Sequence, residues 1–97
     1  MQENALHSKT KTSFYRRLYL AHLIETGTNT VPAICEATGM PRRTAQDTIL
    51  ALQELDIHCE FIGEKKNGHY AILDWGPIAE KWIAKNVSLI KDVLQYS

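Results

Sequence analysis

The chain has 97 residues, of which 44% are hydrophobic and 23% are charged. This length fits one domain with a packed core, and the composition excludes disordered, collagenous and membrane-spanning chains. Eleven Lys and Arg residues balance eleven Asp and Glu residues, so net charge alone gives no argument for a nucleic-acid partner.

The first residues are polar and lack periodicity, which predicts a mobile arm at residues 1–12. They also lack the apolar segment and cleavage site of a secretory signal, so we expect a cytoplasmic protein. From Ser13 onward, apolar residues recur at helical spacing. This pattern predicts a first helix at about 13–25, with Ser13 as its N-cap and Gly27 just past its end.

Two further helices are predicted on either side of a glycine turn. Thr30 is a suitable N-cap for a short helix at about 31–38. Gly39 then allows a sharp turn, because glycine adopts positive φ without a steric penalty. Pro41 fits the first turn of a third helix at about 41–55, whose apolar and polar residues fall on opposite faces.

Beyond residue 55 the hydrophobic period changes from that of a helix to that of a strand. Alternation at 57–62 and 69–73, with Asn67 and Gly68 between them, predicts a β-hairpin. The remaining segment, 77–96, carries an apolar stripe at helical spacing. Because the sequence Asn-Val-Ser in its middle is a poor helix interior, both one long helix and two shorter helices remain open.

The stretch ICEATGMPRRTAQDTILALQELDI resembles the helix-turn-helix core of bacterial winged-helix regulators, and GEKKNGHYAI resembles their wing. The expected fold is mainly α with a β-hairpin, an α+β winged helix-turn-helix. It has a three-helix core, a two-stranded wing and a C-terminal helix. We expect the winged domain to span residues 13–76, and a C-terminal segment at 77–97 to pack on it.

The resemblance implies a sequence-specific, double-stranded DNA-binding regulator. The third helix is then expected in the major groove, and the wing at about 57–73 on the backbone or minor groove. Arg42 or Arg43 suits the guanine edge, and Gln46 suits adenine. Thr44 suits a phosphate or a thymine methyl group.

Cations outside the third helix are also expected to contact DNA. Eight of the eleven Lys and Arg residues fall in three patches along the chain. In the hairpin loop, Lys65, Lys66 and Asn67 are expected at phosphates, which position a protein without specifying sequence. Arg16 and Arg17 would add backbone contacts from the first helix.

A second function stays open, a winged-helix module that binds protein with the same surface. The zero net charge and the acids Asp47, Glu54 and Glu64 favour it. Asp47 is interpreted here as holding a neighbouring arginine in place, and it is counted with the DNA-binding residues. Cations that share one surface favour DNA binding, whereas cations interleaved with acids favour the protein-binding module.

The apolar stripe of the C-terminal segment predicts a homodimer formed together with the first helix. An apolar helix that overhangs a small core often pairs with a second copy, although packing on the chain's own first helix is the simpler role. The residues expected at the dimer interface are Trp82, Ile83, Val87, Ile90 and Leu94.

No motif predicts catalysis, so we expect neither an enzyme nor a cofactor. The sequence lacks GxSxG, P-loop and paired-carboxylate patterns. Cys35 and Cys59 lack the spacing of a zinc site and are interpreted as core residues. A metal-sensing role would require Cys35, Cys59 and His69 to converge in space, and no metal site is expected.

Overall fold

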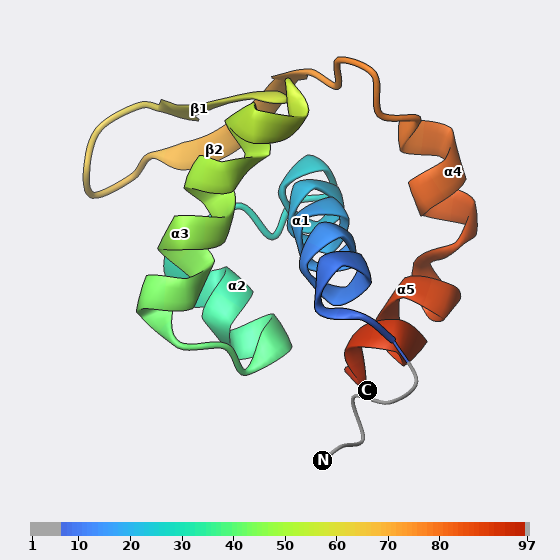
Figure 1. The fold of residues 1–97 in the computed structure, drawn as a ribbon. Coiled ribbons are helices and arrows are strands. Elements are labelled where there is room, and N and C mark those ends of the chain that lie inside the picture. The colour runs from blue at the N-terminus through green and yellow to red at the C-terminus, as the bar shows by residue number, and fades with distance from the viewer. Residues whose placement is uncertain (1–6, 97) are drawn as a thin grey trace.

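The computed structural model describes residues 7–96, in which a two-stranded sheet lies at one edge of a helical body (Figure 1). In chain order the elements are α1 (Lys9–Glu25), α2 (Val31–Thr38), α3 (Arg42–Ala51), the 3-10 helix η2 (Leu52–Leu55), β1 (His58–Ile62), β2 (His69–Asp74), α4 (Glu80–Lys85) and α5 (Val87–Leu94). The two strands are antiparallel. The predicted α+β architecture, a helical core followed by a hairpin and a helical C-terminal segment, is confirmed.

α1 begins earlier than the sequence predicted. Its N-cap is Ser8 and not Ser13, because the Ser8 hydroxyl accepts a hydrogen bond of 3.0 Å from the Lys11 N–H. The first turn, Lys-Thr-Lys-Thr, has no apolar residue, so hydrophobic periodicity does not reveal it. Residues 9–12 therefore belong to the helix and not to an arm, and residues 1–6 of the predicted arm lie outside the described part of the chain.

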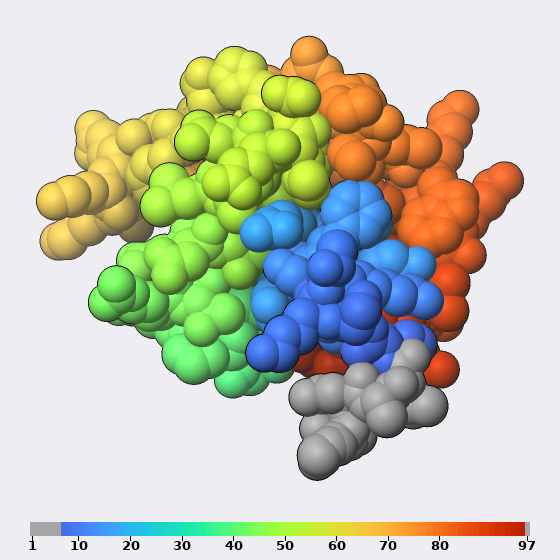
Figure 2. Space-filling view, viewed as in Figure 1, coloured from blue at the N-terminus to red at the C-terminus, as the bar shows by residue number. Residues whose placement is uncertain are grey.

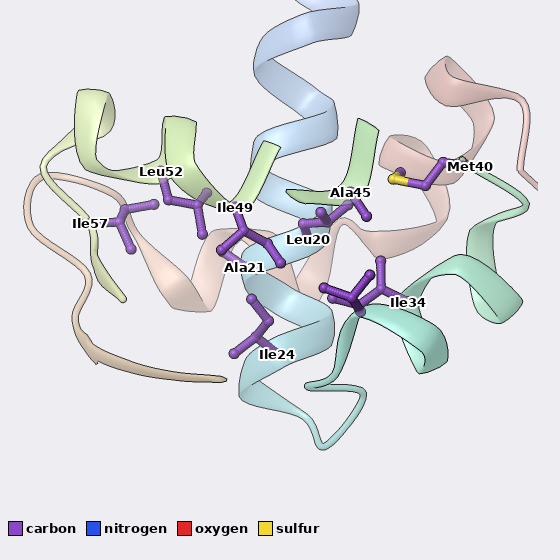
Figure 3. Close-up of a cluster of buried hydrophobic side chains, with 10 residues drawn as sticks. Leu20, Ala21, Ile24, Ile34, Met40, Ala45, Ile49, Leu52 and Ile57 are labelled. Carbon is purple, nitrogen blue, oxygen red and sulfur yellow. The ribbon is translucent and has the colours of Figure 1, made fainter. Parts of the chain in front are cut away.

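α1 is the central helix, with α2 and α3 on one side of it and α4 and α5 on the other (Figure 1). One buried cluster joins α1 to α2, α3 and the start of the hairpin (Figure 3), and it consists of Leu20, Ala21, Ile24, Val31, Ile34, Met40, Ala45, Ile49, Leu52 and Ile57. A second cluster joins α1 to α4 and α5, and it consists of Leu18, Tyr19, Leu23, Ile83 and Ile90. A helix that is apolar on two faces is buried on both.

The C-terminal segment forms two helices, which resolves the alternative that the sequence left open. The break lies at Asn86, whose side-chain amide donates a 2.7 Å hydrogen bond to the Trp82 carbonyl. Asn86 thus satisfies a carbonyl at the end of α4. α4 itself begins at Glu80, three residues after Pro77.

Four of the five side chains expected at a dimer interface pack within the chain. Ile83 and Ile90 are 1% and 0% exposed, and both contact the α1 cluster. Val87 and Leu94 are partly buried against the same cluster. This packing corrects the assignment of Ile83 and Ile90, because a side chain buried under its own α1 is not accessible to a second copy. The interface role of the partly buried Val87 and Leu94 stays a prediction.

The hairpin packs on α1 and η2 and is tied to the connection between α1 and α2. Phe61 and Tyr70 are paired across the strands, with ring centroids 5.0 Å apart. The Tyr70 N–H donates a 2.8 Å hydrogen bond to the Asn29 carbonyl.

The third helix was predicted as one α-helix at about 41–55. Its α-helical part ends at Ala51, and the residues that follow form the 3-10 helix η2. Between residues 7 and 96, no helix is long and apolar enough to cross a membrane.

Candidate nucleic-acid interface

The turn between α2 and α3 sets the direction of α3. Gly39 has a φ of 78°, in the left-handed region that glycine adopts most easily. Thr38 stabilises the same turn, because its hydroxyl donates to the Ile34 carbonyl at 2.8 Å and accepts from the Met40 N–H at 3.1 Å. Met40 is buried below the turn. This role of Thr38 was not predicted from the sequence. A hydroxyl residue directly before the turn glycine is the pattern that would have indicated it.

α3 presents one polar face to solvent and one apolar face to the core. Ala45, Thr48 and Ile49 are buried, whereas the residues on the opposite side are exposed, namely Arg42, Arg43, Gln46, Asp47 and Leu50. Thr48 is accommodated in the core because its hydroxyl donates to the Thr44 carbonyl at 2.7 Å. The base-reading candidates of the sequence analysis therefore occupy the accessible face of α3, with Thr44 at its margin.

Arg43 and Asp47 form the arginine–carboxylate pair that the sequence led us to expect on this helix. The Arg43 Nε lies 3.9 Å from an Asp47 carboxylate oxygen, one turn apart along α3. Their side chains are 90% and 68% exposed, so water screens the attraction between the two charges and the ion pair is weak. Arg43 can therefore leave Asp47 for a stronger partner at small cost.

A polar hollow of about 220 Å³ lies between α1 and α3, and we call it the α1–α3 hollow. Its lining brings together side chains that are far apart in the sequence: Ser13, Arg16, Arg17, Thr44, Asp47, Thr48 and Ala51. Two guanidinium groups, three hydroxyl residues and one carboxylate thus line an open space that can admit a phosphate group. Arg16 and Arg17 share this surface with α3, and Ser13, the N-cap in the sequence analysis, belongs to the hollow instead.

The hairpin loop carries the remaining predicted contacts. Lys65, Lys66 and Asn67 form the turn between β1 and β2, and all three are exposed. The loop projects from the body of the molecule on the side of α3, away from α4 and α5 (Figure 2). Glu64 precedes the two lysines and is exposed as well. The loop therefore mixes cations with one acid at an accessible tip.

A second hollow of about 370 Å³ lies between α3 and the hairpin, and we call it the α3–hairpin hollow. The α3 side chains that line it include Gln46, Asp47 and Leu50, and the hairpin contributes Cys59 and Tyr70. Asp47 thus borders both hollows. Leu50 was not predicted to belong to this face, although an apolar residue in the middle of an otherwise polar helix face is a signal that the sequence contains.

The two cysteines and His69 do not form a ligand cluster. Within residues 7–96 there is no group of three His, Cys, Asp or Glu side chains placed to hold a metal ion. Cys59 pairs across the hairpin with Ile72, whereas His69 pairs with Ile62 at the other end of the strands. Burial raises the pKa of the Cys59 thiol to about 11, so this thiol is protonated at neutral pH. Both cysteines pack against the first core cluster.

This arrangement has counterparts among known proteins. The chain is similar to the crystal structure of a DUF2131 family protein from Shewanella amazonensis SB2B, with 36% sequence identity and a TM-score of 0.86. The match covers 94% of this chain and 91% of that chain. No curated protein matches the chain. A family model described as winged helix-turn helix matches residues 9–94, and the chain therefore belongs to the winged helix-turn-helix family.

Proposed function

We propose that this protein binds double-stranded DNA in a sequence-specific manner and acts as a transcriptional regulator that catalyses no reaction. The observation that carries the proposal is the α1–α3 hollow, where Arg16 and Arg17 meet the exposed face of a helix that follows a glycine turn. In this family the helix after the turn is the element that enters the major groove. α3 is therefore the recognition helix, and the hairpin is the wing.

Base reading falls to the exposed side chains near the start of α3. Arg42 and Arg43 each offer two donors to guanine O6 and N7, and Gln46 offers the donor and acceptor that adenine requires. Asp47 holds Arg43 in its orientation through the Arg43 Nε, and the terminal guanidinium nitrogens of Arg43 contact a base edge. Thr44, at the margin of the α1–α3 hollow, donates to a backbone phosphate.

Phosphate contacts come from both sides of α3. The α1–α3 hollow seats one phosphate between Arg16 and Arg17, and Lys65 and Lys66 with Asn67 contact the backbone or minor groove from the wing. Six cations are assigned to these contacts, and Asp47 is the one acid among the residues that line the α1–α3 hollow. A neutral chain can bind a polyanion in this way, because the local field and not the net charge determines the attraction.

The proposal is tested by fluorescence-anisotropy titration of the purified protein. The duplexes are a random sequence and the sequence upstream of the protein's own gene, each at two salt concentrations. We expect binding that weakens with salt and prefers the upstream duplex. The absence of binding at low salt contradicts the proposal and supports the alternative, a winged-helix module that binds protein through the same face.

Substitutions on α3 distinguish base reading from phosphate contact. We expect Arg42→Ala and Arg43→Ala each to weaken specific binding by about 1–3 kcal/mol and to leave binding to random DNA nearly unchanged. The matched controls are Lys81→Ala and Lys85→Ala, exposed cations of α4 on the far side of α1. Equal losses on both duplexes show that the arginines contact phosphate only.

We further propose that the active species is a homodimer, which would double the number of phosphate contacts. Trp82 supports this proposal, because it is 42% exposed beside an apolar hollow of about 320 Å³ between α1 and α4, where Phe14 and Tyr15 also lie. Sedimentation equilibrium tests it: Trp82→Ala should weaken self-association without loss of folding. A wild-type protein that stays monomeric at all concentrations, with and without DNA, contradicts the dimer.

A further inference from the structure

Leu50 is an apolar side chain on the recognition face that the proposed function has not yet used. It is 68% exposed, more than any other large hydrophobic residue of the described chain. Exposed leucines are common on protein surfaces, so exposure alone carries no conclusion. The position of Leu50 on α3 is what distinguishes it.

Leu50 lies near the middle of the exposed face of α3 and not at its border with the core. At about 100° per residue, it lies about 20° around the helix axis from Arg43 and about 40° from Gln46. The buried residues Ala45 and Ile49 lie about 140° and about 100° around the helix axis from Leu50, towards the core. A side chain in line with Arg43 and Gln46 meets the same surface that they meet.

The spacing along α3 also fits successive base pairs. With a rise of about 1.5 Å per residue, Leu50 lies about 6 Å beyond Gln46, which is close to two base steps of about 3.4 Å. It also lines the α3–hairpin hollow next to Gln46 and Gln53, so it stands among side chains suited to hydrogen bonds with bases. A leucine at this position of α3 would be complementary to an apolar group in the major groove of DNA.

The major groove presents one such group, the 5-methyl of thymine, alongside its donors and acceptors. We propose that Leu50 is a specificity-determining residue that contacts the 5-methyl group of a thymine in the bound DNA. This inference rests on the proposed function, because it requires α3 to lie in the major groove. Contact removes apolar surface of both partners from water and favours thymine over the other bases at one position of the site.

The experiment begins with selection of preferred duplexes from a random library by the wild-type protein. Each thymine of the selected duplex is then replaced in turn by deoxyuridine, which lacks only the 5-methyl group, and binding is measured by anisotropy. We expect one replacement to weaken wild-type binding about three- to tenfold, the range for one buried methyl group. Leu50→Ala should bind the thymine duplex more weakly by a similar factor and no longer distinguish thymine from deoxyuridine there.

Two further variants make the result specific to this contact. Leu50→Met keeps an apolar side chain of similar size and should retain the preference for thymine. Leu89→Ala removes another exposed leucine, 46% exposed on α5, and should behave as the wild type. Circular dichroism melts of all variants separate loss of folding from loss of binding.

The outcomes separate this inference from the proposed function. Wild-type protein that binds its selected duplex but tolerates deoxyuridine at every position overturns the role of Leu50 and leaves DNA binding intact. The same holds if Leu50→Ala keeps the full preference for thymine. A library from which no duplex is enriched overturns both proposals together.

Discussion

Cys59 is a half-buried thiol whose ionisation is coupled to folding. Burial raises its pKa from 9.0 to about 11 in the folded chain. The unfolded chain therefore loses this proton at lower pH than the folded chain does. The contribution of Cys59 to stability is fully present below about pH 9 and is lost as pH rises towards 11.

This coupling predicts a difference between wild type and Cys59→Val in urea unfolding at pH 8 and pH 10. The wild type should lose more free energy of unfolding between these two pH values than the variant, because only the wild type has this thiol to ionise. All other titrating groups, including Tyr19 with its raised pKa, are common to both proteins and cancel in the comparison. Equal losses in both proteins contradict the prediction.

Two glycines with positive φ predict different costs for the same substitution. Gly39 has a φ of 78° and open space where a Cβ would lie, so Gly39→Ala carries only backbone strain, about 1–2 kcal/mol. Gly76 has a φ of 58°, and a Cβ there would overlap the backbone carbonyl of Asp56. We therefore expect Gly76→Ala to lower the free energy of unfolding by clearly more than Gly39→Ala, as measured by urea titration. A reversed order would contradict this packing of Gly76 on Asp56.

At the scale of elements, the helix-turn-helix depends on the hydroxyl of Thr38. Thr38→Val keeps the shape but leaves the Met40 N–H of this partly buried turn without its 3.1 Å acceptor. We expect a loss of about 1 kcal/mol in the free energy of unfolding, because water reaches this donor only in part.

Thr26 provides a matched control for Thr38. It also ends a helix, and its hydroxyl donates to the His22 carbonyl at 2.8 Å, but it is exposed and its hydroxyl receives no turn N–H. Thr26→Val should therefore cost less than Thr38→Val. If both variants lose the same free energy in parallel thermal and urea melts, the turn does not depend on this hydrogen bond.

At the scale of the whole molecule, α5 completes the core of a single chain. Ile90 is fully buried against α1, so Ile90→Ala should destabilise the monomer by about 2–5 kcal/mol. Its neighbour Leu89 is 46% exposed, and Leu89→Ala should cost far less. The loss for Ile90→Ala should not change with protein concentration. A loss that vanishes on dilution would instead place Ile90 in an interface between copies.

The sequence determined the features that depend on neighbouring residues. Helical periodicity, the N-cap Thr30 and the turn glycine Gly39 predicted α2 with its observed bounds, because helix ends and turns are set by local backbone geometry and hydrogen bonds. Alternation of apolar residues predicted the hairpin for the same reason. The exposed position of Arg42, Arg43 and Gln46 also followed from the period of α3.

Only the tertiary structure decided which element covers each apolar face. A helical period shows that Ile83 and Ile90 share an apolar stripe, but packing alone shows that α1 of the same chain covers it. The α1–α3 hollow likewise joins Arg16 to Thr44, which are distant in the sequence, because the crossing of two helices brings them together. Periodicity identifies a face, whereas the partner of that face depends on long-range contacts that no local pattern contains.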